Sequence, residues 1–331
     1  MTEPVLEVSG LSVRFRTDAG VVPAVNDVSF VLKRGETLAL VGESGSGKSV
    51  TSLAVMRLTP APPGCEVRGR ATLSRVGELL SLPEAQMREV RGSRIAMVFQ
   101  EPMTSLNPVL PIGEQIAEPL RYHRGMARAA ALREAAKLLE LVGIPEPGKR
   151  LASYPHQLSG GMRQRVMIAI ALACDPDVLI ADEPTTALDV TVQAQILELL
   201  KALQARTGMA MLFITHNLGV VAEVADRVMV MYAGRVVEQA PVRELFRAPL
   251  MPYTRGLLRS VPKLAPLEAL GAPLTAIPGN VPDPANLPGG CAFAPRCADV
   301  RKVVCEAELP ELDAVGAEHL VRCVRWRELA A

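Results

Sequence analysis

Residues 37–49 read Thr-Leu-Ala-Leu-Val-Gly-Glu-Ser-Gly-Ser-Gly-Lys-Ser. The first five residues form a short continuous apolar run, which is typical of a buried strand in a parallel sheet. Lys48–Leu58 then has the pattern of a helix that stops before Pro60. A strand, a glycine-rich loop and a helix in this order predict a phosphate-binding loop, and the alternative is a chance glycine-rich turn.

The residues of this loop have separate expected roles. Glycines let backbone N–H groups curl around a phosphate, and the N-terminus of the following helix adds its positive dipole. Lys48 is expected to reach the β- and γ-phosphates, and Ser49 to ligate Mg²⁺. The candidate nucleotide-binding residues here are Gly42, Ser44, Gly45, Ser46, Gly47, Lys48, Ser49 and Val50.

A second apolar strand, Val178–Ala181, is followed directly by two carboxylates. Asp182 can hold Mg²⁺ through water, which leaves Glu183 to polarise an attacking water molecule. Acidic residues at the end of a strand are also common as plain solvated turn residues. The phosphate-binding loop upstream favours the catalytic interpretation.

A segment rich in serine and glycine, Leu158-Ser159-Gly160-Gly161-Met162, lies at the start of a predicted helix, Gly161–Ala173. Serine and glycine at this place can act as a helix cap only. The alternative is an anion site without a lysine, in which a hydroxyl and free N–H groups point at a phosphate. Both interpretations stay open from these residues alone.

Strands alternate with helices along the first 240 residues. The predicted strands after the loop are 95–99, 178–181, 210–215 and 228–232, and the predicted helices are 161–173, 190–206 and 218–225. This alternation predicts an α/β fold with a parallel sheet covered on both faces. Leu6–Phe15 and Val25–Leu32 have strand-like patterns, and Ile112–Val142 has the pattern of an α-helical insertion.

Composition limits the classes of function. The chain has 36 Lys+Arg and 35 Asp+Glu, and a net charge of +1 argues against general nucleic-acid binding. Hydrophobic residues make up 49% of the chain, but its apolar runs are far shorter than the roughly 20 residues of a membrane-spanning helix. The N-terminal Met1–Pro4 lacks the basic and apolar regions of a signal peptide, so we expect a cytosolic chain.

In their order, these motifs resemble those of the ATP-binding subunits of ABC transporters. The matching residues are the loop 42–49, Gln100, Leu158–Met162, Asp182-Glu183, Ala187-Leu188-Asp189 and His216. The resemblance covers about residues 5–240. It implies a P-loop ABC cassette with a mixed sheet on a RecA-like core, an antiparallel β subdomain and an α-helical subdomain at about 101–160.

The resemblance also implies roles for individual residues. Gln100 would contact Mg²⁺ and water and sense the membrane partner, and His216 would act at the γ-phosphate. The segment Ser159–Gly161 would close on ATP held by another subunit, and Asp189 would lie at that dimer interface. Phe15 is either the aromatic residue that stacks on adenine or a core-facing strand residue.

Several longer stretches are similar to the oligopeptide/dipeptide/nickel branch: Gln100–Pro108, Ala181–Ala194, Met231–Arg235 and Pro252–Thr254. This implies an ATP-hydrolysing subunit of an importer for peptides or related small solutes, at the cytoplasmic face of the membrane. Its partners would be a second ATPase subunit, two permease subunits and, indirectly, an external solute-binding protein. The predicted domains are a cassette at 1–240 and a small irregular extension at 241–331. An ABC ATPase acting on DNA or the ribosome, and an exporter, are the competing hypotheses.

The predicted extension contains Cys291, Cys297, Cys305 and Cys323, with 5, 7 and 17 residues between them. Disulfides are disfavoured in the cytosol, and structural zinc usually has closer cysteine pairs. Members of this branch are known with a [4Fe–4S] cluster in a similar segment, although the interval before Cys305 is one residue longer than theirs. A cluster, zinc and unligated thiols stay open as interpretations. His319 is expected to be a surface or packing residue rather than a ligand, and Cys65 and Cys174 are expected to behave as small apolar residues.

Overall fold

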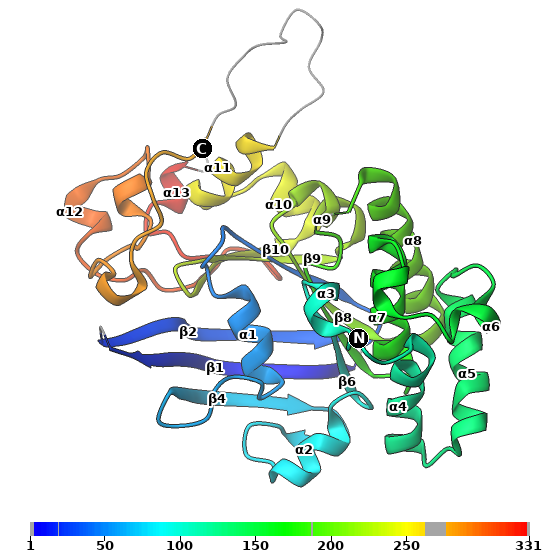
Figure 1. The fold of residues 1–331 in the computed structure, drawn as a ribbon. Helices are drawn as coiled ribbons and strands as arrows, with labels where there is room; N and C mark the ends of the chain where they lie inside the picture. The colour runs from blue at the N-terminus through cyan, green and yellow to red at the C-terminus, as the bar shows by residue number, and fades with distance from the viewer. Residues whose placement is uncertain (1–2, 19, 187, 262–275, 330–331) are drawn as a thin grey trace, which may run out of the picture. The chain divides into compact units, whose positions relative to one another are not determined.

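The computed structural model describes residues 3–18, 20–186, 188–261 and 276–329 (Figure 1). The chain forms two compact units, each assembled from three segments. Unit 1 comprises Met1–Glu7, Val31–Thr37 and Ala71–Ile214, and unit 2 comprises Val8–Phe30, Leu38–Arg70 and Thr215–Ala331. Ala187 of the predicted 187–189 motif lies outside the described residues, as do Met1 and Thr2 of the expected N-terminus.

In unit 2 the predicted strand before the glycine-rich loop is present as β3 (Thr37–Val41), with every residue buried. It pairs in parallel with β9 (Arg227–Tyr232), so that Leu38 lies opposite Arg227 and Val41 opposite Val230. A turn with positive φ at Ala233 and Gly234 reverses the chain into β10 (Arg235–Pro241), which pairs antiparallel with β9. No strand was predicted from the sequence at the position of β10.

The C-terminal segment continues this sheet. β12 (Leu320–Val321) pairs antiparallel with β10, and β11 (Asp313–Ala314) pairs antiparallel with β12, which gives the order β11-β12-β10-β9-β3 in unit 2. The other described elements of this segment are short: η3 (Pro284–Asn286), η4 (Ala294–Arg296), α12 (Lys302–Cys305) and α13 (Trp326–Leu329). These short elements are attached to the sheet through β12, and the division into a cassette and an extension stays a prediction.

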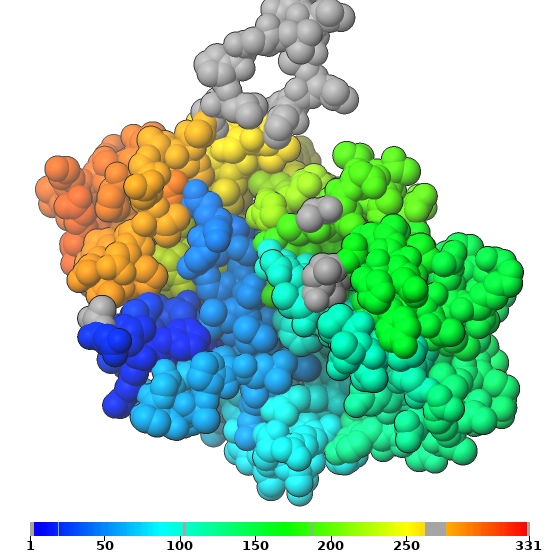
Figure 2. All heavy atoms as spheres, viewed as in Figure 1, coloured from blue at the N-terminus to red at the C-terminus, as the bar shows by residue number. Residues whose placement is uncertain are grey.

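One hydrophobic core in unit 2 joins residues that are far apart in the sequence. Ala39 and Val41 of β3 belong to the same buried cluster as Phe293 and Val321 of the C-terminal segment. Three helices add side chains to it: α9 (Leu218–Val224), α10 (Val242–Arg247) and α11 (Pro252–Ser260). Figure 2 shows the orange atoms of the C-terminal segment packed against the blue atoms near the glycine-rich loop.

The helix that follows the loop is α1 (Lys48–Val55). Three strands each begin in one unit and end in the other: β1 (Pro4–Thr17), β2 (Gly20–Lys33) and β4 (Cys65–Leu73). The helix predicted to reach Leu58 ends at Val55, because Arg57 adopts a left-handed backbone with φ of 52°. In unit 1, β4 pairs antiparallel with β5 (Gly77–Glu78), and α2 (Glu84–Val90) follows.

Unit 1 contains three parallel strands in the order β8-β7-β6. They are β6 (Ile95–Val98), β7 (Val178–Asp182) and β8 (Ala210–Thr215), and the helices α7 (Gly160–Leu172) and α8 (Val190–Thr207) follow their predicted positions within one or two residues. The carboxyl ends of β6 and β7 lie at the same edge, which brings the segments after them together.

The predicted helical insertion is confirmed as two helices, α4 (Ile112–Arg124) and α5 (Arg128–Leu141), which lie beside α7 (Figure 1). Gly125, with φ of 61°, ends α4 in a conformation that glycine adopts at low cost. The short elements of this region are α3 (Pro102–Ser105), α6 (Pro147–Arg150) and η1 (Pro155–Gln157). None of the helices in the described ranges is both long and apolar enough to cross a membrane. The boundary near residue 240 and the limits of the helical subdomain stay predictions.

Candidate functional site

The glycine-rich loop joins the buried strand β3 to the N-terminus of α1. Gly47 caps this helix with φ of 99°, and a Cβ atom there would lie 2.5 Å from the carbonyl oxygen of Ala24. Gly42 has φ of 152°, and its Cβ would lie 2.3 Å from the carbonyl oxygen of Met231. The loop therefore approaches neighbouring backbone too closely for side chains at these two positions.

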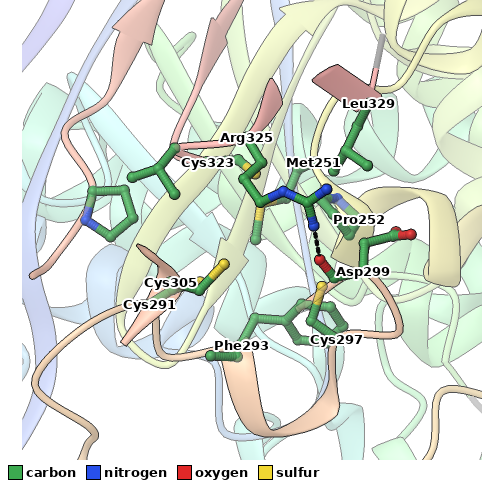
Figure 3. Close-up of a pocket in the computed structure, with 13 residues that line it drawn as sticks. Met251, Pro252, Cys291, Phe293, Cys297, Asp299, Cys305, Cys323, Arg325 and Leu329 are labelled. Carbon is green, nitrogen blue, oxygen red and sulfur yellow. Dashed lines mark hydrogen bonds between the residues drawn. The ribbon is translucent and has the colours of Figure 1, made fainter. Parts of the chain in front are cut away.

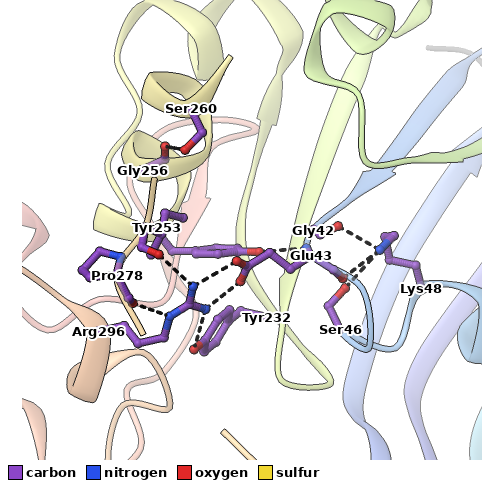
Figure 4. Close-up of polar contacts among 11 residues, drawn as sticks. Gly42, Glu43, Ser46, Lys48, Tyr232, Tyr253, Gly256, Ser260, Pro278 and Arg296 are labelled. Carbon is purple, nitrogen blue, oxygen red and sulfur yellow. Dashed lines mark hydrogen bonds and ion pairs between the residues drawn. The ribbon is translucent and has the colours of Figure 1, made fainter. Parts of the chain in front are cut away.

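Lys48 points back over the loop instead of away from it (Figure 4). Its Nζ atom donates hydrogen bonds to the carbonyl oxygens of Gly42 at 2.8 Å and Glu43 at 2.9 Å, and to Ser46 Oγ at 3.4 Å. The residue is only 6% exposed. A cationic amine, a helix N-terminus and successive loop N–H groups give this part of unit 2 the chemistry of a phosphate site.

In unit 1, the segments after β6 and β7 bring Gln100 and Glu183 together. Gln100 Nε2 donates to Glu183 Oε2 at 3.0 Å, and Thr186 Oγ1 donates to the same oxygen at 2.9 Å. Glu183 has an unusual φ of 45°, and its N–H donates to the carbonyl oxygen of Ile214 at 2.9 Å. A non-glycine residue held in this region is uncommon outside turns and functional sites.

Asp182 is the last residue of β7, immediately before Glu183, and it is 5% exposed. Asp182 is nearly buried and Glu183 is more accessible. This difference is compatible with the two roles expected from the sequence, in which Asp182 holds Mg²⁺ through water and Glu183 is the base. Their assignment stays a prediction.

The segment Ser159–Gly161 forms the start of α7. Ser159 is the N-cap residue, and its hydroxyl accepts the N–H of Met162 at 3.3 Å. The capping interpretation is therefore confirmed, and Ser159 and Gly160 are also exposed. The two interpretations are compatible, because a cap hydroxyl at an exposed helix N-terminus can also face an anion.

The two glycines at this helix start have different surroundings, which gives a matched pair of variants. A Cβ atom on Gly161 would lie 2.6 Å from Val192 Cγ1 of α8, whereas a Cβ atom on Gly160 would meet nothing closer than Leu188 Cδ2 at 3.8 Å. We expect Gly161→Ala to lower the free energy of unfolding by about 1–3 kcal/mol through overpacking. Gly160→Ala should change it by less than about 0.5 kcal/mol. Urea denaturation of both variants measures the difference, and equal stabilities would contradict the packing described.

The other predicted residues lie on separate elements. Asp189 is exposed and caps α8, accepting the N–H of Val192 at 3.0 Å. His216 is exposed in the segment between β8 and α9. Phe15 is half-buried on β1, and both interpretations of it stay open. The roles implied for these three residues stay predictions.

Comparisons with known proteins give the family. Residues 25–186 match the model described as ABC transporter, and residues 237–305 match the model of the oligopeptide/dipeptide transporter C-terminal region. BMEII0863 of Brucella melitensis, whose name describes a peptide import ATP-binding protein, is 57% identical over 99% of both chains. The chain belongs to the ABC transporter ATP-binding subunits of the oligopeptide/dipeptide permease family. The dipeptide transport ATP-binding protein DppD of Bacillus subtilis is 52% identical to this ABC ATPase, over 97% of this chain and 94% of its own.

Solved structures agree with this family assignment. The ATP-binding cassette MJ0796, in a dimeric post-hydrolysis state bound to ADP and Pi, has a TM-score of 0.64 and 28% identity. It covers 72% of this ABC ATPase and 99% of its own chain. The ABC cassette fold that the family resemblance implies is therefore confirmed, and it agrees with the α/β class predicted from the alternating strands and helices.

The four C-terminal cysteines of this ABC ATPase line one cavity (Figure 3). Burial raises the pKa of the Cys297 and Cys323 thiols to about 11, and it also raises the pKa of Cys291. These three thiols are therefore protonated at neutral pH. The cavity thus brings together the four cysteines that were considered as one group from the sequence, Cys291, Cys297, Cys305 and Cys323.

The structure does not support an iron–sulfur cluster at this cavity. Its volume is about 20 Å³, which is room for about one water molecule. Among the described residues, no group of three or more His, Cys, Asp or Glu side chains is arranged to hold a metal ion. Cys305 Sγ accepts the N–H of Arg301 at 3.5 Å, and the Cys305 carbonyl oxygen accepts the N–H of Cys291 at 2.8 Å.

His319 packs, as expected, and does so through a buried polar contact. Its Nε2 atom lies 2.9 Å from Oε1 of Glu238, a residue of β10 with no exposed surface. The Glu238 carboxylate also accepts the N–H groups of Leu250 at 2.7 Å and Met251 at 3.2 Å. Cys65 and Cys174 are buried, as predicted.

Two residues that contact the phosphate-binding loop of this ABC ATPase, Arg296 and Tyr253, were not predicted from the sequence to do so. Glu43, within the loop, forms an ion pair with Arg296, and its N–H donates to the hydroxyl of Tyr253. The one available signal was the Pro252–Thr254 match to the family branch, which gave no role for the tyrosine. These contacts join residues more than 200 positions apart, so local patterns do not reveal them.

Proposed function

We propose that this ABC ATPase hydrolyses ATP and couples the hydrolysis to the uptake of peptides or related small solutes. The observation that carries the proposal is the loop 42–49, with Lys48 folded across its carbonyl groups at the start of α1. The names of the relatives and the match at residues 237–305 support peptides as the transported class.

The loop residues would bind the phosphates. Backbone N–H groups of residues 44–47 and the α1 N-terminus would face the β-phosphate, and the Lys48 amine would exchange its carbonyl partners for phosphate oxygens. Ser49, Asp182 and Gln100 offer oxygen ligands, which suit Mg²⁺. Bound Mg²⁺ would neutralise charge on the phosphates.

Glu183 would act as the base that polarises the attacking water. Gln100 and Thr186 both donate to its Oε2 atom, which would hold the carboxylate in place while it accepts a proton from the water. Gln100 would report the state of this carboxylate to the segment that follows it. His216 would contact the γ-phosphate, as the family resemblance implies.

A second ATPase subunit would complete each site, either a related subunit or an identical copy. The residues that would face it are Ser159, Gly160, Gly161 and Asp189, and the exposed positions of Ser159, Gly160 and Asp189 support this. Val190, next to Asp189, is 81% exposed and would also be covered by the partner.

Two permease subunits would hold the protein at the cytoplasmic face of the membrane. Exposed apolar side chains lie near Gln100 in the sequence of unit 1: Phe99 is 40% exposed, Val109 74% and Leu110 41%. An apolar surface of this kind suits a helix of a membrane subunit. An external solute-binding protein would act through these permeases.

The test is ATP-driven peptide uptake by the complex with its permease subunits in proteoliposomes. We expect Lys48→Ala to lower both ATP hydrolysis and uptake by at least roughly 100-fold, because the phosphate charge loses its main cation. Lys137→Ala, at an exposed position on α5, is the control and should keep both activities. Uptake at the wild-type rate in Lys48→Ala would contradict the proposal.

A further inference from the structure

The C-terminal segment contacts the phosphate-binding loop through one ion pair (Figure 4). Arg296 Nη1 lies 2.7 Å from Glu43 Oε2, and Arg296 Nη2 lies 3.0 Å from Glu43 Oε1. The guanidinium therefore binds the carboxylate through two parallel hydrogen bonds, which fix its orientation as well as its position. The Arg296 side chain is 5% exposed, so water screens this pair less than a surface pair.

All the polar groups of Glu43 are engaged at once. Its carboxylate binds Arg296, its N–H donates to Tyr253 Oη at 2.9 Å, and its carbonyl oxygen accepts from Lys48 Nζ at 2.9 Å. Glu43 thus links Arg296 and Tyr253 directly to Lys48. The Lys48 amine is the group expected to bind phosphate. A shift of Glu43 would move an anchor of Lys48.

Arg296 and Tyr253 each make further contacts outside the loop. Arg296 Nε donates to the carbonyl oxygen of Pro278 at 2.9 Å, and Nη1 lies 3.4 Å from Tyr232 Oη. The rings of Tyr232, Tyr253 and Phe293 form a cluster with centroids 4.6–5.3 Å apart. The chain has only 11 aromatic residues (6 Phe, 4 Tyr, 1 Trp), and three of them support this contact.

The charge of Glu43 gives the ion pair a function beyond packing. A carboxylate within a loop that binds triphosphate would repel the ligand unless a cation neutralises it. Arg296 supplies that cation from outside the loop. Because two hydrogen bonds hold the Glu43 carboxylate toward the C-terminal segment, the rest of the loop stays available to an anion.

We propose that Arg296 is a positioning residue for ATP binding, acting through Glu43 and supported by Tyr253. The C-terminal segment then helps to set the conformation of the phosphate-binding loop. It is also attached to the sheet through β12. This inference rests on the proposed ATPase function. No role in nucleotide binding was predicted from the sequence for Arg296 or for the C-terminal segment.

The test compares Arg296→Gln with the wild-type chain in the assembled complex. We expect the KM for Mg²⁺-ATP to rise about tenfold, since small displacements of a binding group are costly, while kcat stays within about threefold. Amide hydrogen exchange should become faster in residues 42–49. Arg322→Gln is the control, because Arg322 also donates to carbonyl oxygens, those of Val236 in β10 and of Pro310, which lie outside the loop.

A double-mutant cycle separates positioning from general stability. Glu43→Gln and Arg296→Gln together should raise KM no more than Arg296→Gln alone, because both remove the same ion pair. Tyr253→Phe is a milder variant, which should speed exchange at the Glu43 amide without unfolding the chain. Wild-type KM and wild-type exchange in Arg296→Gln would overturn the proposal, as would independent, additive effects in the cycle. A wild-type complex that does not hydrolyse ATP would instead overturn the proposed function.

Discussion

Replacing Glu183 with glutamine is expected to lower the ATP turnover of the assembled complex by about 10²–10³-fold. Glutamine keeps the shape of the side chain, and its amide oxygen can still accept from Gln100 and Thr186, the two donors seen at Oε2. It cannot take a proton from water at neutral pH. The affinity for Mg²⁺-ATP should therefore stay within about threefold of wild type, because binding does not use the base.

Single-turnover hydrolysis and direct titration with Mg²⁺-ATP measure the two quantities separately. Glu198→Gln, at an exposed position on α8, is the matched control and should behave as wild type. Turnover within a few-fold of wild type in Glu183→Gln would remove Glu183 from the role of base. Loss of ATP binding in this variant would indicate a folding defect, which the midpoint of thermal unfolding detects.

The second large effect is expected at Glu238, on stability and not on chemistry. This carboxylate is fully buried and accepts hydrogen bonds from the N–H groups of Leu250 and Met251 as well as contacting His319. Glu238→Ala leaves these partners buried without an acceptor. We expect the free energy of unfolding to fall by about 3 kcal/mol or more.

Urea denaturation compares this variant with Glu308→Ala, where the carboxylate is exposed and the change should be within about 0.5 kcal/mol. Glu238→Gln should be intermediate, because its amide oxygen replaces only one of the two carboxylate oxygens. Equal free energies of unfolding for Glu238→Ala and Glu308→Ala would contradict this prediction. They would show that the groups that contact the Glu238 carboxylate find other hydrogen-bond partners in the folded variant.

Much of the nucleotide-binding machinery could be predicted from the sequence, because its signals are local. The run Thr37–Val41 and the glycines after it specify a buried strand and a close backbone approach, and both are present. The apolar strand before Asp182 likewise placed two carboxylates at a sheet edge. In each case the residues that carry the chemistry are neighbours along the chain.

The remaining features depend on contacts between distant residues. Arg296 reaches Glu43 across 253 positions, and no periodicity links them. β4 was not predicted, since Arg68, Gly69 and Arg70 interrupt its apolar pattern. The cysteines were grouped correctly, but the size of the cavity that they line depends on how α12 and η4 pack, which spacing alone does not determine.

The sheet of unit 2 has a consequence for the order in which the protein can form during synthesis. Val41, beside the phosphate-binding loop, and Val321 belong to one hydrophobic core, although 280 positions (321 − 41) separate them along the chain. The ribosome makes Val41 long before it makes Val321. That core cannot close until Val321 has emerged, so the apolar strands made earlier stay incompletely covered until then. Chaperones that hold nascent chains would therefore meet this half of the molecule for longest.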